Sequence, residues 1–123
     1  MKLKNNYYKL LEVRHQDVAT AIYHVALLPD CNVYRGHFPD EPVCPGVCNM
    51  QMIKECTEEF VGKQLHQTSV KQCRLTALMT PSECPDVNVR IDVLSASEQS
   101  FTIMASIYDH KQIYMEYKGE MTV

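Results

Sequence analysis

The stretch that decides the fold is residues 36–47, which read Gly36-His37-Phe38-Pro39-Asp40-Glu41-Pro42-Val43-Cys44-Pro45-Gly46-Val47. Proline and glycine recur from Pro29 to Gly46, and both residue types oppose a regular helix or a central strand. This region is therefore expected to be a long structured loop. At its end Pro45 has the fixed φ that suits a helix start, so the loop leads directly into a helix.

The predicted helix opens at Gly46-Val47 and runs without a breaker up to Gly62, which is a natural C-terminal cap. At about 100° per residue the apolar side chains share one broad arc of this helix. They are Met50, Met52, Ile53, Cys56, Phe60 and Val61. The opposite side carries Gln51, Lys54, Glu55 and Glu58, with Val47 among them. The apolar arc needs a sheet to cover it.

The sequence on either side of the loop and helix has the pattern of β-strands. Before the loop, residues 19–28 are rich in β-branched and aromatic side chains. After the helix, strands are predicted at 68–79, 87–94, 100–108 and 112–123. The short connections between these four, such as Pro81–Asp86, are typical of antiparallel neighbours. The order predicts an α+β fold, in which one long helix packs on an antiparallel sheet.

Length, composition and charge limit the classes of protein to which this sequence can belong. The chain has 123 residues, 46% hydrophobic and 22% charged, which fits one globular domain spanning residues 1–123. The net charge of −3 argues against nucleic acid as the main partner. No apolar stretch approaches the roughly 20 residues that span a bilayer, so no membrane partner is expected. The basic N-terminus lacks the apolar core of a signal peptide, and the expected location is the cytoplasm.

The six cysteines are expected to be reduced and to pack as small apolar side chains, because no export signal accompanies them. Cys44 and Cys48 have a spacing that zinc sites tolerate. No second pair of Cys or His at ligand spacing completes a tetrahedral set. The sequence therefore predicts no metal site, and nothing in it calls for another cofactor.

The motifs in residues 36–47 stand at the spacing of a known family. They are Gly36-His37-Phe38-Pro39, then Pro42, then Pro45-Gly46-Val47. On these residues the sequence resembles the β-hydroxyacyl-ACP dehydratases. More loosely, the likeness extends over most of the chain, through the Pro-rich turn at 81–86 and the closing segment 118–123. The resemblance implies the hotdog fold, an antiparallel sheet wrapped around one long central helix.

The resemblance also implies an activity, the dehydration of a 3-hydroxyacyl thioester held on acyl carrier protein or coenzyme A. Fatty-acid, polyene and polyketide synthesis use such domains. His37 would transfer the proton at the α-carbon, since a histidine with a pKa of about 6.5 can accept a proton at neutral pH. The N–H groups of Gly46 and Val47 would polarise the thioester carbonyl, where the positive end of the helix dipole suits a developing enolate oxygen. Phe38, next to His37, is the other residue expected at the substrate.

One position departs from the family pattern. Fourteen residues after His37 the family has Glu or Asp, and this sequence has Gln51. An amide can hold a hydroxyl or a water by hydrogen bonds, but it cannot be a general acid or base. Glu55 lies one helical turn further along the same polar side and is the candidate to replace the missing carboxylate. His37, Gln51 and Glu55 are therefore the catalytic candidates.

Two other functions stay open. In the first, the protein is a catalytically impaired acyl-thioester binder, or the passive subunit of a heterodimeric dehydratase whose partner supplies the carboxylate. In the second, it is a hotdog thioesterase. Such thioesterases also generally use a helix carboxylate to activate water, and this sequence has Gln51 at that position.

A second subunit is expected, because one helix on a sheet leaves apolar surface that a dimer pairing sheet edges would cover. The resemblance implies a homodimer or a dimer-based oligomer with active sites at the interface, the histidine from one subunit and the helix residue from the other. An acidic carrier protein would need a basic patch near the site. Lys63, Lys71 and Arg74 are the residues available for it.

Overall fold

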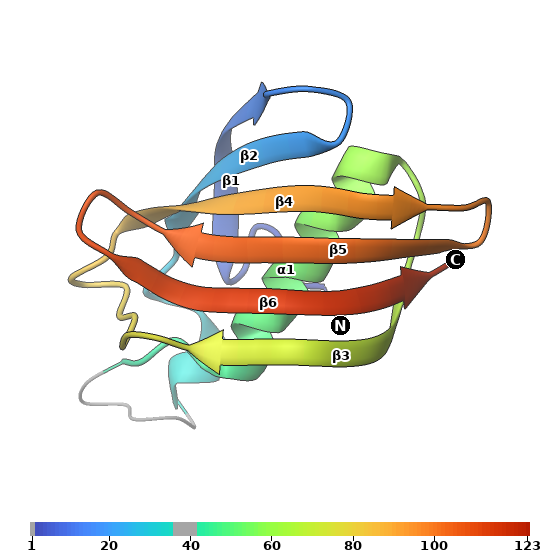
Figure 1. Ribbon diagram of the computed structural model, residues 1–123. Helices are drawn as coiled ribbons and strands as arrows, with labels where there is room; N and C mark the ends of the chain where they lie inside the picture. Colours follow the sequence, from blue (N-terminus) through green and yellow to red (C-terminus); the bar gives the residue numbers. More distant parts are fainter. Residues whose placement is uncertain (1, 36–41) are drawn as a thin grey trace.

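The computed structural model describes residues 2–35 and 42–123. In these residues one helix, α1 (Gly46–Val61), lies against one face of an antiparallel sheet (Figure 1). A short 3₁₀ helix, η1 (Asn32–Arg35), follows β2. The strands are β1 (Tyr8–His15), β2 (Thr20–Leu27), β3 (His66–Leu75), β4 (Asp86–Ala96), β5 (Ser100–Tyr108) and β6 (Ile113–Thr122). Their order in the sheet is β1-β2-β4-β5-β6-β3. The predicted α+β architecture is confirmed.

The helix has the ends that the sequence predicts. Pro45 precedes it with φ −66° and makes no side-chain capping hydrogen bond. Gly62 follows it in the left-handed region, at φ 73°, and donates its N–H to the carbonyl of Glu58. Along the buried face, Met52 and Ile53 are fully enclosed in the core that the helix shares with the sheet. Burying each such side chain is worth about 1.5–3 kcal/mol, which fixes the helix on the sheet.

Two features of the sheet differ from the prediction. The strand β1 was not expected, because it lies at an edge, is mostly exposed, and its pairing with β2 shifts between Leu10 and Glu12. That shift interrupts the alternation that would have revealed the strand. The strand β3 lies at the other edge beside β6, not beside β4. The prediction that Pro81–Asp86 joins antiparallel neighbours is therefore wrong: residues 76–85 cross from the edge to the middle of the sheet.

The cysteines are free thiols, as expected, but they are not all packing residues. Cys44, Cys48, Cys56 and Cys84 are buried, Cys31 is half-buried, and Cys73 on the edge strand β3 is exposed. Among residues 2–35 and 42–123, no three His, Cys, Asp or Glu side chains gather in a group that could hold a metal ion. In the same residues, no helix combines the length and apolar character that crossing a membrane requires.

Candidate active site

The start of α1 borders a pocket, and Gly46 and Val47, the two residues predicted to bind the thioester oxygen, are part of its wall. The pocket has a volume of about 660 Å³, and Val47 at its rim is 70% exposed. Its walls come from the end of the loop, the first turn of the helix and the segment after β3. They are formed by Val43, Cys44, Pro45, Gly46, Val47, Asn49, Leu75, Thr76, Ala77, Leu78, Met79 and Tyr114. The first N–H groups of a helix have no acceptor within it, so they are donors that an acceptor bound at the start of α1 can use.

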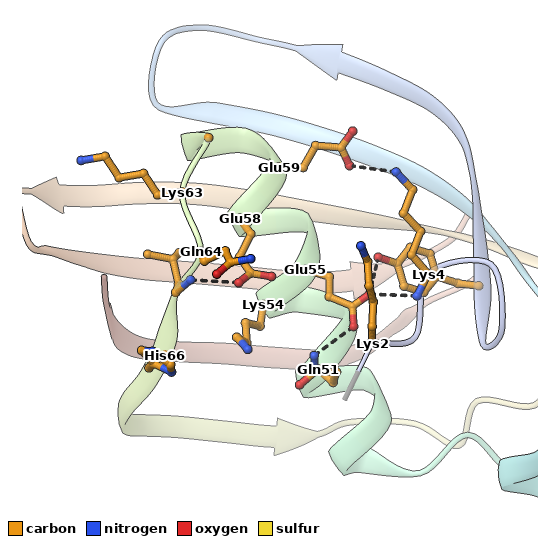
Figure 2. Close-up of a pocket in the computed structure, with 13 residues that line it drawn as sticks. Lys2, Lys4, Gln51, Lys54, Glu55, Glu58, Glu59, Lys63, Gln64 and His66 are labelled. Atoms are coloured by element: carbon orange, nitrogen blue, oxygen red, sulfur yellow. Dashed lines mark hydrogen bonds and ion pairs between the residues drawn. The ribbon is translucent and has the colours of Figure 1, made fainter.

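Gln51 and Glu55 lie together on α1. The side-chain nitrogen of Gln51 donates to Oε2 of Glu55 over 2.9 Å (Figure 2). Because a carboxylate only accepts, this contact fixes which end of the Gln51 amide faces Glu55. The amide oxygen is therefore the end that faces away from Glu55.

Glu55 is buried beneath the N-terminal segment, with 8% of its surface exposed. The backbone N–H groups of Leu3 and Lys4 donate to its two oxygens over 2.7 and 2.9 Å, and the Tyr8 hydroxyl donates over 3.0 Å. With Gln51, four donors fill the roughly four acceptor sites of the carboxylate. The sequence pattern predicted that Glu55 lies on the polar side of the helix, but it did not indicate that the N-terminal segment buries it. The N-terminal residues that contact it had no recognisable pattern.

A second depression, of about 630 Å³, lies over this part of the helix (Figure 2). Lys63, one of the residues named for a carrier patch, lines it together with Lys2, Lys4 and Lys54. Lys4 forms an ion pair with Glu59 over 3.8 Å. The other two residues named for the patch, Lys71 and Arg74, are exposed on β3, so the structure does not bring all three together.

His37 and Phe38 lie outside the described residues. The contacts of Tyr34 and Cys44, which flank this segment in the sequence, are described. Before it, the Tyr34 hydroxyl lies 3.4 Å from the Cys44 sulfur. After it, the Cys44 N–H donates to the Met79 carbonyl over 2.8 Å. Burial raises the pKa of the Cys44 thiol above its ordinary value, so this thiol is neutral at pH 7 and is not a nucleophile.

Asn49 is a polar residue of the site that the sequence analysis missed. It is 3% exposed, it lines the pocket at the start of α1, and its Oδ1 accepts from the Tyr7 hydroxyl over 2.8 Å. The signal available in the sequence was an asparagine in the first turns of a helix, between Cys48 and Met50, since asparagine is a poor helix former.

The contacts of Glu55 give a first testable prediction. Replacing Glu55 with alanine is expected to lower the free energy of unfolding by about 2–4 kcal/mol, because it leaves buried donors of the N-terminal segment without an acceptor. Chemical denaturation measures this. The matched control is Glu59→Ala, which removes only the exposed pair with Lys4 and should cost less than about 1 kcal/mol. Equal losses in the two variants would contradict the anchoring role of Glu55.

Comparison with known proteins connects this site to a family. Residues 13–116 match the model of the ApeI-like family, described as ApeI dehydratase. The 3-hydroxyacyl-[acyl-carrier-protein] dehydratase FabZ of Thermoanaerobacter sp. (strain X514) is 32% identical over 66 residues, 48% of this chain and 46% of that protein. The same protein of Thermoanaerobacter pseudethanolicus matches equally. The chain thus spans about half the length of the curated relatives it matches.

Solved structures show the same fold. The dehydratase heterocomplex ApeI:P from Xenorhabdus doucetiae matches with a TM-score of 0.73 at 15% identity, over 94% of this chain and 97% of that one. A hypothetical thioesterase with coenzyme A from Streptococcus pneumoniae TIGR4 matches with a TM-score of 0.65 at 8% identity, over 94% and 84%. The predicted hotdog fold is confirmed. On the family match, which covers most of its length, the chain belongs to the ApeI-like dehydratase family.

Proposed function

We propose that this protein dehydrates 3-hydroxyacyl thioesters to enoyl thioesters, with the acyl group carried on acyl carrier protein, in fatty-acid synthesis or related polyene or polyketide synthesis. The observation that carries the proposal is the pocket at the start of α1, with Gly46 and Val47 in its wall, in a chain of the ApeI-like dehydratase family. The name of the FabZ relatives supports acyl carrier protein as the carrier. Coenzyme A is the other carrier to test.

The proposed step uses one titratable side chain. The imidazole of His37 takes the proton from the α-carbon, and the electron pair of that bond forms the double bond to the β-carbon. The bond from the β-carbon to the hydroxyl breaks, and the imidazolium returns the proton so that water leaves. The N–H groups of Gly46 and Val47 stabilise the negative charge on the thioester oxygen. Gln51 holds the leaving hydroxyl in place by hydrogen bonding. It does not protonate this hydroxyl, because its amide has no titratable proton near neutral pH.

The test is a product analysis. The purified protein is incubated with 3-hydroxybutyryl and longer 3-hydroxyacyl thioesters of acyl carrier protein and of coenzyme A, and the products are separated by mass spectrometry. Enoyl thioester is the expected product. Free thiol without enoyl product would instead support the thioesterase function, which the likeness to a thioesterase structure keeps as a competitor.

A second candidate function is that of one subunit in a heterodimeric dehydratase. It is favoured by two observations together: position 51 carries an amide, and the structure with a TM-score of 0.73 to this chain is named as a heterocomplex. A partner with a carboxylate at the equivalent helix position would complete the site. In that case this chain alone gives no product.

For either function we also propose a second subunit, which pairs with this chain along the edge strand β3. Nine of its ten residues are exposed, Gln67 being the exception, and Val70 is an apolar side chain on it that is 45% exposed. Such a long, open edge with apolar side chains favours strand pairing with another chain. Pairing there would bring the partner beside the pocket, because Leu75 at the end of β3 lines it.

The mass in solution tests this edge. The wild-type protein is expected to have twice the chain mass of 14.1 kDa in light scattering, and Val70→Lys is expected to shift it toward 14.1 kDa. The control is Leu94→Lys, at a residue of β4 that is 49% exposed and away from the edge. A dimer that survives Val70→Lys, or dissociates equally with Leu94→Lys, would exclude β3 as the interface.

A further inference from the structure

Asn49 holds a buried polar side chain next to the place proposed for the thioester. It stands three residues after Gly46, and helical side chains lean toward the N-terminal turn, so its amide lies over the start of α1. Only 3% of the residue is exposed, and most side chains around it in the pocket wall are apolar, such as Val43, Leu75 and Met79. A buried amide in such surroundings is costly unless it is hydrogen-bonded.

One end of this amide has a partner and the other end has none within the described part of the chain. The Oδ1 atom accepts from the Tyr7 hydroxyl over 2.8 Å, and Tyr7 itself is fully buried. The Nδ2 atom has no acceptor among residues 2–35 and 42–123. Among those residues, every side-chain nitrogen or oxygen that is inaccessible to solvent has a hydrogen-bond partner. Because Nδ2 has no partner there, it must be accessible, and we infer that it faces the pocket that Asn49 lines.

We propose that Asn49 is a substrate-binding residue whose Nδ2 donates a hydrogen bond to the carbonyl oxygen of the acyl thioester, as a third donor beside the N–H groups of Gly46 and Val47. This inference rests on the proposed function for its ligand class. Tyr7 is the positioning residue: by donating to Oδ1 it turns the donor end of the amide into the pocket. Three converging donors hold the oxygen on which negative charge develops as the α-proton leaves.

The test measures binding, with two ligands that differ only in the carbonyl. One is a butyryl thioester of pantetheine, and the other is the matching S-butyl thioether. The double variant Tyr7→Phe/Asn49→Leu is compared with the wild type, so that removing the amide leaves no buried hydroxyl unpaired. The double variant is expected to bind the thioester about 10-fold more weakly than the wild type does and to bind the thioether equally well. An equal loss for both ligands, or no loss for either, would overturn the proposal.

A second variant keeps the test decisive if the double variant does not fold. Asn49→Asp preserves an acceptor for Tyr7 and puts an oxygen in the place of the donor. Above neutral pH it is expected to lose thioester binding selectively, again by about 10-fold. Unchanged selectivity for the thioester in Asn49→Asp would overturn the proposal as well.

The binding test also separates this inference from the proposed function. Suppose that no form of the protein makes enoyl product, but replacing Asn49 still weakens binding of the thioester and not of the thioether. The dehydratase function then fails and the donor role of Asn49 stands. If enoyl product forms and replacing Asn49 changes binding of the thioester and the thioether equally, the donor role fails and the function stands.

Discussion

Replacing His37 with alanine is expected to lower the rate of enoyl thioester formation by a factor of about 10²–10⁴, the usual contribution of a positioned general acid or base. The expected loss lies at the upper end of this range, because the proposed step uses His37 both to take the α-proton and to return it to the hydroxyl. The other candidates on α1 cannot take over. Gln51 has no titratable proton, and the Glu55 carboxylate already accepts four hydrogen bonds.

The matched control for this variant is His110→Ala, since His110 is exposed in the turn between β5 and β6. The rate of the His110→Ala variant should equal that of the wild type. A separate binding measurement with the butyryl thioester should give similar affinities for wild type and His37→Ala. A His37→Ala variant that keeps more than about a tenth of the wild-type rate would remove His37 from the proton-transfer role.

Replacing Gln51 with glutamate is expected to raise the rate of enoyl formation by a factor of about 10² or more, because it supplies the titratable group that the helix lacks. Its surroundings favour an acid. The Gln51 side chain lies 2.9 Å from the Glu55 carboxylate, and two carboxylates so close cannot both be ionised without repulsion, so one pKa of the pair rises. The raised pKa keeps a proton available for the leaving hydroxyl nearer to neutral pH.

The control for this variant is Gln64→Glu, which adds the same charge to the depression over α1 but on the segment after the helix. It should leave the rate unchanged. Product formed by Gln51→Glu and none formed by the wild type would support the heterodimer function, with the carboxylate normally supplied by a partner. A Gln51→Glu variant that folds and is slower than the wild type would contradict the role given to position 51.

The sequence was sufficient for the elements whose pattern is local. Val87, Val89 and Ile91 alternate with polar residues and form the central strand β4, because one face of that strand packs on the helix. The helix runs from Gly46 to Val61, since Pro45 and Gly62 have the backbone conformations that start and end one. These features depend on residues a few positions apart, so they can be read without knowing the rest of the fold.

The features that the sequence did not reveal depend on contacts between distant segments. Glu55 is buried because Leu3, which is 52 residues away, donates to it. The edge strand β1 is largely exposed, and exposure removes the alternation that marks a strand. The strand β3 overlaps the segment predicted at 68–79, but its place beside β6 depends on pairing between distant segments. The orientation of Asn49 depends on Tyr7, from the same N-terminal segment. The N-terminal residues therefore shape the site, although they carry no motif.

The most direct measurement is isotope incorporation during turnover in D₂O. The protein is incubated with a 3-hydroxybutyryl thioester, and the acyl products are analysed by mass spectrometry. A dehydratase with a proton carrier at the α-carbon predicts enoyl thioester together with deuterium at the α-carbon of recovered substrate, and the loss of both in His37→Ala. Recovered substrate without deuterium and without enoyl product, or free thiol as the product, would contradict the assignment.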